Sequence, residues 1–176
     1  MVLERLLLRL YRLWPLLRGA RLAPGARVHP SARVTRWNAL SLGKNALLYW
    51  RGDALIGLHG RLTLGADSHL APYFYLLIGD HHLYFGHNVA VGPRSLFFCH
   101  SNGIPADVPV TPFTECHVDG DIRVGDNVFI GAGCIVLPGC EIGDNVVLAA
   151  GSVAKGRLES GWLYAGAPAK QVRRLC

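Results

Sequence analysis

A histidine stands at the point where the regular pattern of this sequence breaks. His100 follows Phe97-Phe98-Cys99, and the segment after it, residues 101–117, has no period and contains three prolines. Prolines in an aperiodic stretch indicate a loop that leaves the fold, and long excursions from a rigid scaffold usually serve binding. Histidine has a pKa suited to accepting a proton near neutral pH. His100 is therefore a candidate general base; the alternative is a loop histidine that caps a turn.

The chain has eight histidines and five cysteines, which raises the question of a metal or disulfide site. His81, His82, His87 and His117 accompany His100, and this number makes a zinc site conceivable. No Cys-x-x-Cys is present and the number of cysteines is odd, so neither a disulfide framework nor a zinc knuckle is expected. We expect no metal and a reducing, cytoplasmic setting.

Residues 118–153 contain a six-residue repeat, the scaffold that must position His100. Cut every six residues, the stretch reads VDGDIR-VGDNVF-IGAGCI-VLPGCE-IGDNVV-LAAGSV. The first slot holds aliphatic residues (Val118, Val124, Ile130, Val136, Ile142 and Leu148), and the fifth holds mostly small or β-branched ones (Ile122, Val128, Cys134, Cys140, Val146 and Ser152). A period of six is typical of a chain that turns a corner every six residues and closes a triangular coil every three blocks. Both columns are predicted to point into a parallel β-helix.

The rest of the chain sets the expected domain organisation. Residues 1–23 predict an amphipathic helix, with leucines on one face and Arg5, Arg9 and Arg12 on another. The coil is expected over residues 24–155 with an excursion loop at 101–117, followed by a short C-terminal extension at 156–176. The helix is too charged to span a bilayer. It is expected either to pack on the coil or a neighbouring subunit, or to make peripheral contact with a membrane through residues 1–21.

Composition and charge limit the classes of partner that the chain is expected to bind. Hydrophobic residues make up 51% of the chain and charged ones 17%, which favours subunits that pack along flat faces. The net charge of +6 is spread over both ends and forms no basic-aromatic stripe, so nucleic acid is not an expected partner. A small polyanionic ligand or an anionic membrane surface fits better. We expect a cytoplasmic oligomer, peripheral at the inner face of the membrane if the helix binds lipid.

The sequence resembles the hexapeptide-repeat acyltransferases, closest to the branch of maltose, galactoside, xenobiotic and polysaccharide O-acetyltransferases. The resemblance covers roughly residues 64–174 and rests on VGDNVFIGAGCIVLPGCEIGDNVVLAAGSV and on the closing AGAPAKQVRR, similar to the family ending G-x-P-A-[KR]-x-[IV]-[KR]. It implies a left-handed β-helix, a homotrimer and acyl transfer from coenzyme A to a hydroxyl or amine. His100 matches the family's catalytic histidine, which lies at the end of a repeat just before an excursion loop.

The resemblance also implies acceptor contacts. Asp80 matches a carboxylate that contacts the acceptor in sugar-acetylating members; the alternative is a corner residue that satisfies backbone amides. Phe74 stands where those members have an acceptor-binding asparagine, and Tyr73 and Tyr75 flank it. This departure points to another glycan or a more apolar acceptor.

Eight positions match the family's coenzyme A contacts: Phe129, Ala132, Ala150, Gly151, Ser152, Lys155, Lys170 and Arg173. Small residues let the pantetheine arm approach the backbone, and flexible cations suit phosphates. The alternative for the basic tail is a solvated end. The chain lacks the family's Thr-Lys-Asp-Ile-Pro-like link and reads Ala154-Lys155-Gly156-Arg157-Leu158, so either Lys155 or Arg157 is the expected basic residue.

The resemblance therefore implies a coenzyme A-dependent O-acyltransferase that moves acetyl from acetyl-CoA to a hydroxyl of a sugar or glycan precursor, either small or lipid-linked. A sugar hydroxyl is barely ionised at neutral pH, so its attack on a thioester requires a base such as His100. Two alternatives stay open. One is a non-enzymatic β-helix that serves as an assembly platform. The other is a zinc enzyme similar to gamma-class carbonic anhydrases, although their His-Gly-Cys within a repeat is absent here.

Overall fold

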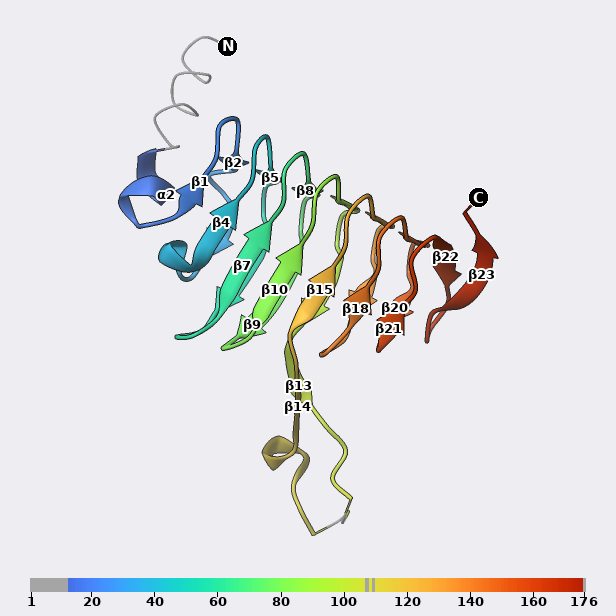
Figure 1. The fold of residues 1–176 in the computed structure, drawn as a ribbon. Coiled ribbons are helices and arrows are strands. Elements are labelled where there is room, and N and C mark those ends of the chain that lie inside the picture. The colour runs from blue at the N-terminus through green and yellow to red at the C-terminus, as the bar shows by residue number, and fades with distance from the viewer. Residues whose placement is uncertain (1–12, 107, 109, 176) are drawn as a thin grey trace.

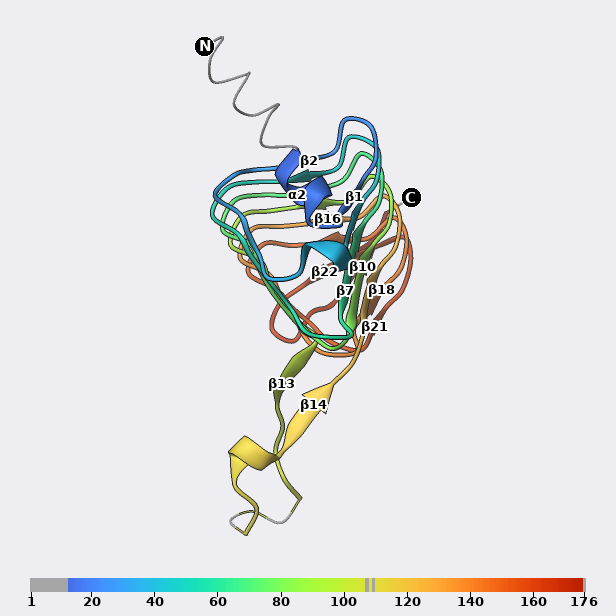
Figure 2. The same cartoon turned by 90° about the vertical axis from the view of Figure 1, so that its left-hand side faces the viewer.

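A computed structural model describes residues 13–106, 108 and 110–175. In this part of the chain, short parallel strands stack into three sheets that wind around one axis with a triangular cross-section (Figures 1 and 2). The chain climbs the face nearest the viewer in Figure 1, passes behind it and advances to the right with each turn, which makes the coil left-handed. The predicted left-handed parallel β-helix is confirmed.

The sheets are numbered in the order in which the chain meets them. The first contains β1 (Arg21–Leu22), β4 (Leu40–Leu42), β7 (Arg61–Leu64), β10 (His82–Phe85), β15 (Ile122–Val124), β18 (Glu141–Ile142) and β21 (Arg157–Leu158). The second contains β2 (Arg27–Val28), β5 (Leu47–Leu48), β8 (His69–Leu70), β11 (Ala90–Val91), β16 (Phe129–Ile130), β19 (Val147–Leu148), β22 (Trp162–Ala165) and the antiparallel β23 (Lys170–Arg174). The third contains β3 (Arg33–Val34), β6 (Asp53–Ile56), β9 (Tyr75–Gly79), β12 (Leu96–Phe98), β17 (Ile135–Val136) and β20 (Val153–Ala154).

Three corners join these sheets. The first corner connects the first sheet to the second, the second corner connects the second to the third, and the third corner leads into the next coil. An antiparallel hairpin, β13 (His100–Asn102) and β14 (His117–Asp119), projects from the third corner and carries the 3-10 helix η2 (Phe113–Glu115) (Figure 2). The predicted excursion loop is thus a hairpin whose strands reach beyond residues 101–117.

The coil interior is filled by the two columns that the repeat predicts. From Ile122 onward, every residue of both columns is at most 3% exposed. Val118 is the exception, because it lies in β14 of the hairpin and is 48% exposed. The phase of six therefore begins only after the hairpin has returned to the third corner, and the placement of Val118 inside the coil was wrong.

The coil also extends past the two boundaries expected from the sequence. β1 pairs in parallel with β4 from Arg21, and β22 pairs in parallel with β19 as far as Tyr164, so the ladders run beyond residues 24 and 155. Leu158 and Tyr164 continue the buried interior, although Leu158 follows the buried Ala154 by four residues and not by six. Residues 1–12 of the predicted helix lie outside the described residues, and α2 (Leu13–Leu17) is the part that the structure describes. No described helix is long and apolar enough to cross a membrane.

Left-handed residues with small polar side chains shape the first corner. Asn45, Asp67, Asn88, Asn127 and Asn145 have φ angles between +55° and +57°, a region that asparagine and aspartate tolerate better than most residues. Two pairs of these side chains bond between neighbouring coils: Asn45 Nδ2 donates to Asp67 Oδ1 at 2.8 Å, and Asn127 Nδ2 donates to Asn145 Oδ1 at 2.7 Å. This corner is therefore held by its own polar ladder.

Phe97 lies in the part of the core beside the hairpin, and its substitution tests the packing there. Its ring is fully buried and lies edge-on to that of Phe85 at a centroid distance of 5.0 Å. We expect Phe97→Ala to lower the free energy of unfolding by about 3–5 kcal/mol, through lost burial and the cavity left behind. Leu58→Ala, a truncation at a 69% exposed position, should cost about 0.5 kcal/mol or less. Equal shifts in urea unfolding would contradict this view of the core.

Candidate functional site

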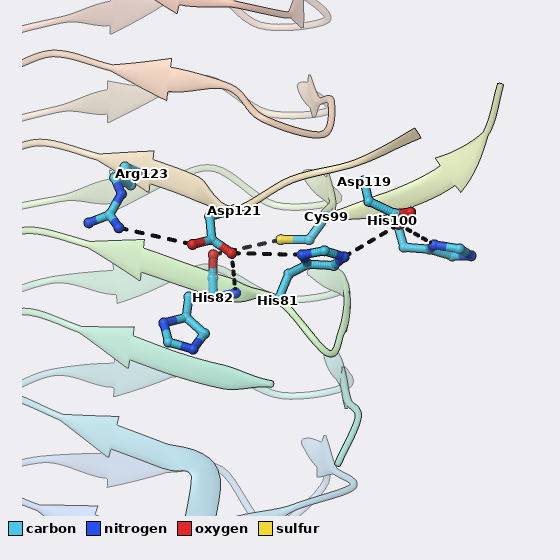
Figure 3. A network of polar contacts seen from close by, with 7 residues as sticks. All are labelled: His81, His82, Cys99, His100, Asp119, Asp121 and Arg123. Carbon is cyan, nitrogen blue, oxygen red and sulfur yellow. Dashed lines mark hydrogen bonds and ion pairs between the residues drawn. The ribbon is translucent and has the colours of Figure 1, made fainter. Parts of the chain in front are cut away.

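The hairpin places His100 opposite a carboxylate at the third corner. In the antiparallel register His100 pairs with Asp119, so their side chains lie on the same face of the hairpin. The imidazole Nδ1 lies 2.5 Å from the carboxylate Oδ1 (Figure 3). The two ends of the excursion therefore form a histidine–aspartate pair where the chain leaves and re-enters the coil.

The charge of Asp119 fixes the roles of the two ring nitrogens of His100. The hydrogen bond with His100 lowers the pKa of Asp119, and the charges of His100 and His81 act in the same direction. An ionised carboxylate only accepts hydrogen bonds, so Nδ1 of His100 must donate. In the neutral form of the ring, the other nitrogen, Nε2, then keeps its lone pair. The two side chains are 40% and 42% exposed, so a substrate can reach this base.

A second histidine and a second carboxylate extend the pair along the corner. His81, from the preceding coil, places Nε2 3.3 Å from Asp119 Oδ1 and Nδ1 3.8 Å from Asp121 Oδ1. Asp121 Oδ1 also accepts a 2.8 Å bond from the backbone amide of His82, and its Oδ2 lies 4.0 Å from Arg123 Nη2. Figure 3 shows the chain of contacts from Arg123 to His100. Asp119, which orients His100, is thus also contacted by His81, whose other ring nitrogen lies near Asp121.

Two further groups lie beside His100. The ring of His117 is 4.9 Å from that of His100, across the hairpin. Cys99 is buried inside the coil, and burial raises the pKa of its thiol to about 12, so the sulfur is protonated at neutral pH and is a poor nucleophile. Among the described residues no three histidine, cysteine or acidic side chains are grouped to hold a metal ion. The local chemistry is that of an oriented base.

The structure separates the residues expected to contact the acceptor. Asp80 Oδ1 accepts a 2.9 Å bond from the backbone amide of His59, the corner role named above as the alternative. Phe74 is 1% exposed, and a Cβ on Gly52 would lie 2.2 Å from its ring, so Phe74 is a core residue at the second corner. Tyr73 remains 42% exposed at that corner.

The positions matched to coenzyme A contacts lie mainly on the second sheet and the second corner. Phe129 is 51% exposed in a groove that Val147 also lines. Ala132 and Ala150 stack on successive coils, linked by the 2.9 Å bond from the Gly151 amide to the Ala132 carbonyl. Ser152, in contrast, is buried, and its hydroxyl accepts a bond from the amide of Gly166. Its side chain faces inward.

The three matched cations are exposed but not adjacent. Lys155 follows β20 at the third corner, on a coil C-terminal to His100, whereas Lys170 and Arg173 lie in β23 at the edge of the second sheet. Within one chain, His100 therefore lies at a different corner from the second-sheet positions. A site that uses both sets would draw on two corners of the coil.

Asp119, His81 and Asp121 were missing from the predicted site. Asp119 and Asp121 lie in the first block of the hexapeptide frame, which gave them no role in the site. The signal that could have found Asp119 is topological: an excursion that leaves and rejoins one corner must bring its two ends together. A carboxylate at the end of the aperiodic segment is then the natural partner of a histidine at its start.

The lowered pKa of Asp119 predicts a pH dependence of stability. A carboxyl group whose pKa is lower in the folded protein stabilises the fold fully above its ordinary pKa, about 3.9, and this contribution is lost as the pH falls through the folded value. In urea unfolding between pH 6 and pH 2, the stability of Asp119→Asn should fall less steeply with acid than that of the wild type. Parallel curves would contradict the pairing with His100.

The comparisons with known proteins agree with this architecture. The profile of the bacterial transferase hexapeptide family (six repeats) matches residues 121–156, where the structure also begins the regular repeat. A solved structure of AntD, an N-acyltransferase from Bacillus cereus in complex with dTDP and 3-hydroxybutyryl-CoA, superposes with a TM-score of 0.78 at 21% identity. The match covers 89% of this chain and 84% of that chain.

Two other solved structures share the fold more distantly. A maltose O-acetyltransferase from Clostridium difficile 630 has a TM-score of 0.58 at 22% identity, covering 89% of this chain and 70% of that chain. A hexapeptide-repeat acetyltransferase from Vibrio cholerae, complexed with acetyl coenzyme A, has a TM-score of 0.57 at 18% identity, covering 87% and 72%. The predicted hexapeptide repeat and its β-helix are therefore confirmed.

Proposed function

We propose that this protein is an acyltransferase that takes its acyl group from a coenzyme A thioester and uses His100 as general base. The observation that carries the proposal is the 2.5 Å contact between His100 Nδ1 and Asp119 Oδ1 at the base of the hairpin. The shared fold of coenzyme A-dependent transferases supports it.

The reaction follows from the orientation of the imidazole. Nε2 of His100 removes the proton from an acceptor hydroxyl as its oxygen attacks the thioester carbonyl carbon. Asp119 stabilises the imidazolium that forms. The tetrahedral intermediate then collapses, the carbon–sulfur bond breaks, and the proton passes from Nε2 to the leaving thiolate. The products are the acylated acceptor and free coenzyme A, and no covalent enzyme intermediate is needed.

The assembly proposed is a homotrimer with sites between subunits. From β9 onward the outward face of the third sheet is largely apolar and half-buried in one chain, with Leu77, Phe98 and Ile135 among its residues. The hairpin presents Ile104 and Phe113, which are 85% and 57% exposed. Packing between copies would cover both surfaces and bring His100 of one copy near the second corner of its neighbour. Sedimentation equilibrium should give three times 19.1 kDa; a monomer would contradict the shared site.

The coenzyme would lie along the second sheet and second corner of the neighbouring copy. Phe129 offers an exposed ring there, and Ala132, Ala150 and Gly151 leave room for the pantetheine arm. Lys155, Lys170 and Arg173 supply exposed cations for phosphates. Ser152 can contribute only through its backbone, because its side chain is buried.

The proposed acyl group is acetyl and the proposed acceptor is a hydroxyl of a sugar or glycan precursor, with Asp80 near it. An amine acceptor is the second candidate, favoured by the likeness to the N-acyltransferase AntD. The test is thiol release from acetyl-CoA against panels of sugars, nucleotide sugars and amino sugars. Mass spectrometry of the product separates esters from amides. A protein that neither binds coenzyme A nor releases thiol with any acceptor would contradict the proposal and favour an assembly platform.

The proposed location is the cytoplasm, with peripheral contact at the inner face of the membrane. Leu17 of α2 is 83% exposed, and Arg18 lies over the ring of the exposed Trp14 at 4.2 Å, an arrangement suited to the boundary of an anionic bilayer. Cosedimentation with vesicles containing anionic lipid tests it. Recovery of all the protein in the supernatant would contradict membrane contact.

A further inference from the structure

The second corner of the coil carries a column of residues in one repeated position. Arg51, Tyr73, Arg94, Gly133 and Gly151 occupy it on successive coils, all with φ angles between +54° and +71°. From Tyr73 onward, the backbone amide of each member bonds to the preceding coil at 2.9 to 3.2 Å. The acceptor is the carbonyl of the residue just before the column member of that coil, as in the bond from Tyr73 to Trp50. The column is therefore a continuous edge of the coil, exposed to solvent along its length.

The two halves of this column differ in a way that the fold does not require. Glycine is the residue best suited to a positive φ, and a Cβ at Gly133 or Gly151 would meet nothing within 4 Å. The other half places Arg51, Tyr73 and Arg94 in the same left-handed conformation, which bulky side chains adopt only at a steric cost. Strained positions of this kind gather at ligand sites, so their side chains call for a functional reason.

The three side chains form one surface. Arg51 Nη1 donates to Tyr73 Oη at 3.3 Å, and the guanidinium of Arg94 lies 5.8 Å from the centre of the Tyr73 ring. The ring of Trp50, 42% exposed, lies beside Arg51 in sequence. Within the described residues, the arginines with a carboxylate oxygen within 4 Å are Arg33 and Arg123. No described carboxylate pairs with Arg51 or Arg94, so their guanidinium groups are available to a ligand.

We infer that the Arg51–Tyr73–Arg94 column binds a nucleoside diphosphate group. Two guanidinium groups provide fork-shaped donors for the diphosphate oxygens, and an exposed aromatic ring between them offers a stacking face for a base or sugar ring. The same chemistry occurs in a nucleotide-sugar acceptor and in the nucleotide part of coenzyme A. Calling the ligand a transferase substrate rests on the proposed function, whereas the binding site itself does not.

Glycine substitution gives a test that separates binding from folding. Arg51→Gly and Arg94→Gly remove the cations and relieve the backbone at positive φ, so the urea midpoint should stay constant or rise. The affinities are measured by calorimetric titration with uridine 5′-diphosphate, coenzyme A and inorganic pyrophosphate. Each arginine variant should bind at least one of the two nucleotides about tenfold or more weakly than the wild type. Tyr73→Gly should weaken the nucleotide but not pyrophosphate.

The control is Asn45→Gly, the same exchange at a positive φ on the first corner, which should leave every affinity unchanged. Weaker binding of uridine diphosphate with unchanged binding of coenzyme A identifies the nucleotide-sugar acceptor as the ligand of this site. Weaker binding of coenzyme A identifies the coenzyme as the ligand. Unchanged affinities for both in the arginine variants would overturn the inference. Nucleotide binding that depends on Arg51 and Arg94, without any thiol release, would contradict the proposed function but would support the inferred nucleotide site.

Discussion

Replacing His100 by alanine is expected to leave a folded protein that binds coenzyme A with unchanged affinity and transfers acyl groups about 10²- to 10⁴-fold more slowly. The reason is that the acceptor hydroxyl loses the imidazole that Asp119 orients at the base of the hairpin. The measurement is initial thiol release under saturating acyl-CoA, with calorimetry for coenzyme binding and urea unfolding for the fold.

His59→Ala is the matched control. His59 lies at the same corner on an earlier coil, is exposed, and bonds Asp80 through its backbone amide, which the substitution keeps. Its turnover should equal that of the wild type. Near-normal turnover in His100→Ala would show that the base lies elsewhere, and a large loss in the control would show that any change at this corner damages the site.

Asp119→Asn is expected to lower kcat on the order of 10²-fold while the KM for acyl-CoA stays nearly constant. A carboxylate can only accept from Nδ1, whereas an amide can also donate to it, so the variant allows the tautomer in which Nε2 carries the hydrogen. The same exchange costs roughly 10⁴-fold in a buried catalytic triad. Asp119 is 42% exposed, so solvent replaces part of its effect and a smaller loss is expected.

Asp53→Asn provides the comparison for this positioning residue. Asp53 also pairs with a cation, at 3.0 Å from Arg33 Nε, but on the outward face of the third sheet near the N-terminal end. Its replacement should not alter kcat. A merely structural role for Asp119 would lower stability in Asp119→Asn without lowering kcat, and that result would contradict the positioning role.

The interior of the coil was predictable because the repeat imposes a strict spacing. Each corner returns the same two slots to the inside, so Val124 and Ile122 and their successors could be assigned from the phase alone. Val118 shows where this reasoning fails. A valine in the right phase looks the same whether the chain has already rejoined the coil or is still in the hairpin, and only the pairing of Ser101 with Val118 decides.

The site was predictable in part for a related reason. His100 is marked by the break in the repeat, a feature local in sequence. Its partner Asp119 lies on the far side of the excursion, and His81 comes from the preceding coil, so the network depends on strand register and stacking. Phe74 and Ser152 show the limit of matching single positions, because the sequence does not reveal that both side chains lie in the core.

The most direct test of the oriented base is the protonation of the His100 ring, observed by ¹⁵N NMR of histidine-labelled protein and assigned by its loss in His100→Ala. The pair with Asp119 predicts, above the pH at which the imidazole becomes neutral, a hydrogen on Nδ1 and none on Nε2, and a mixture of tautomers in Asp119→Asn. A neutral ring with its hydrogen on Nε2 in the wild type would contradict the role of His100 as the proton acceptor.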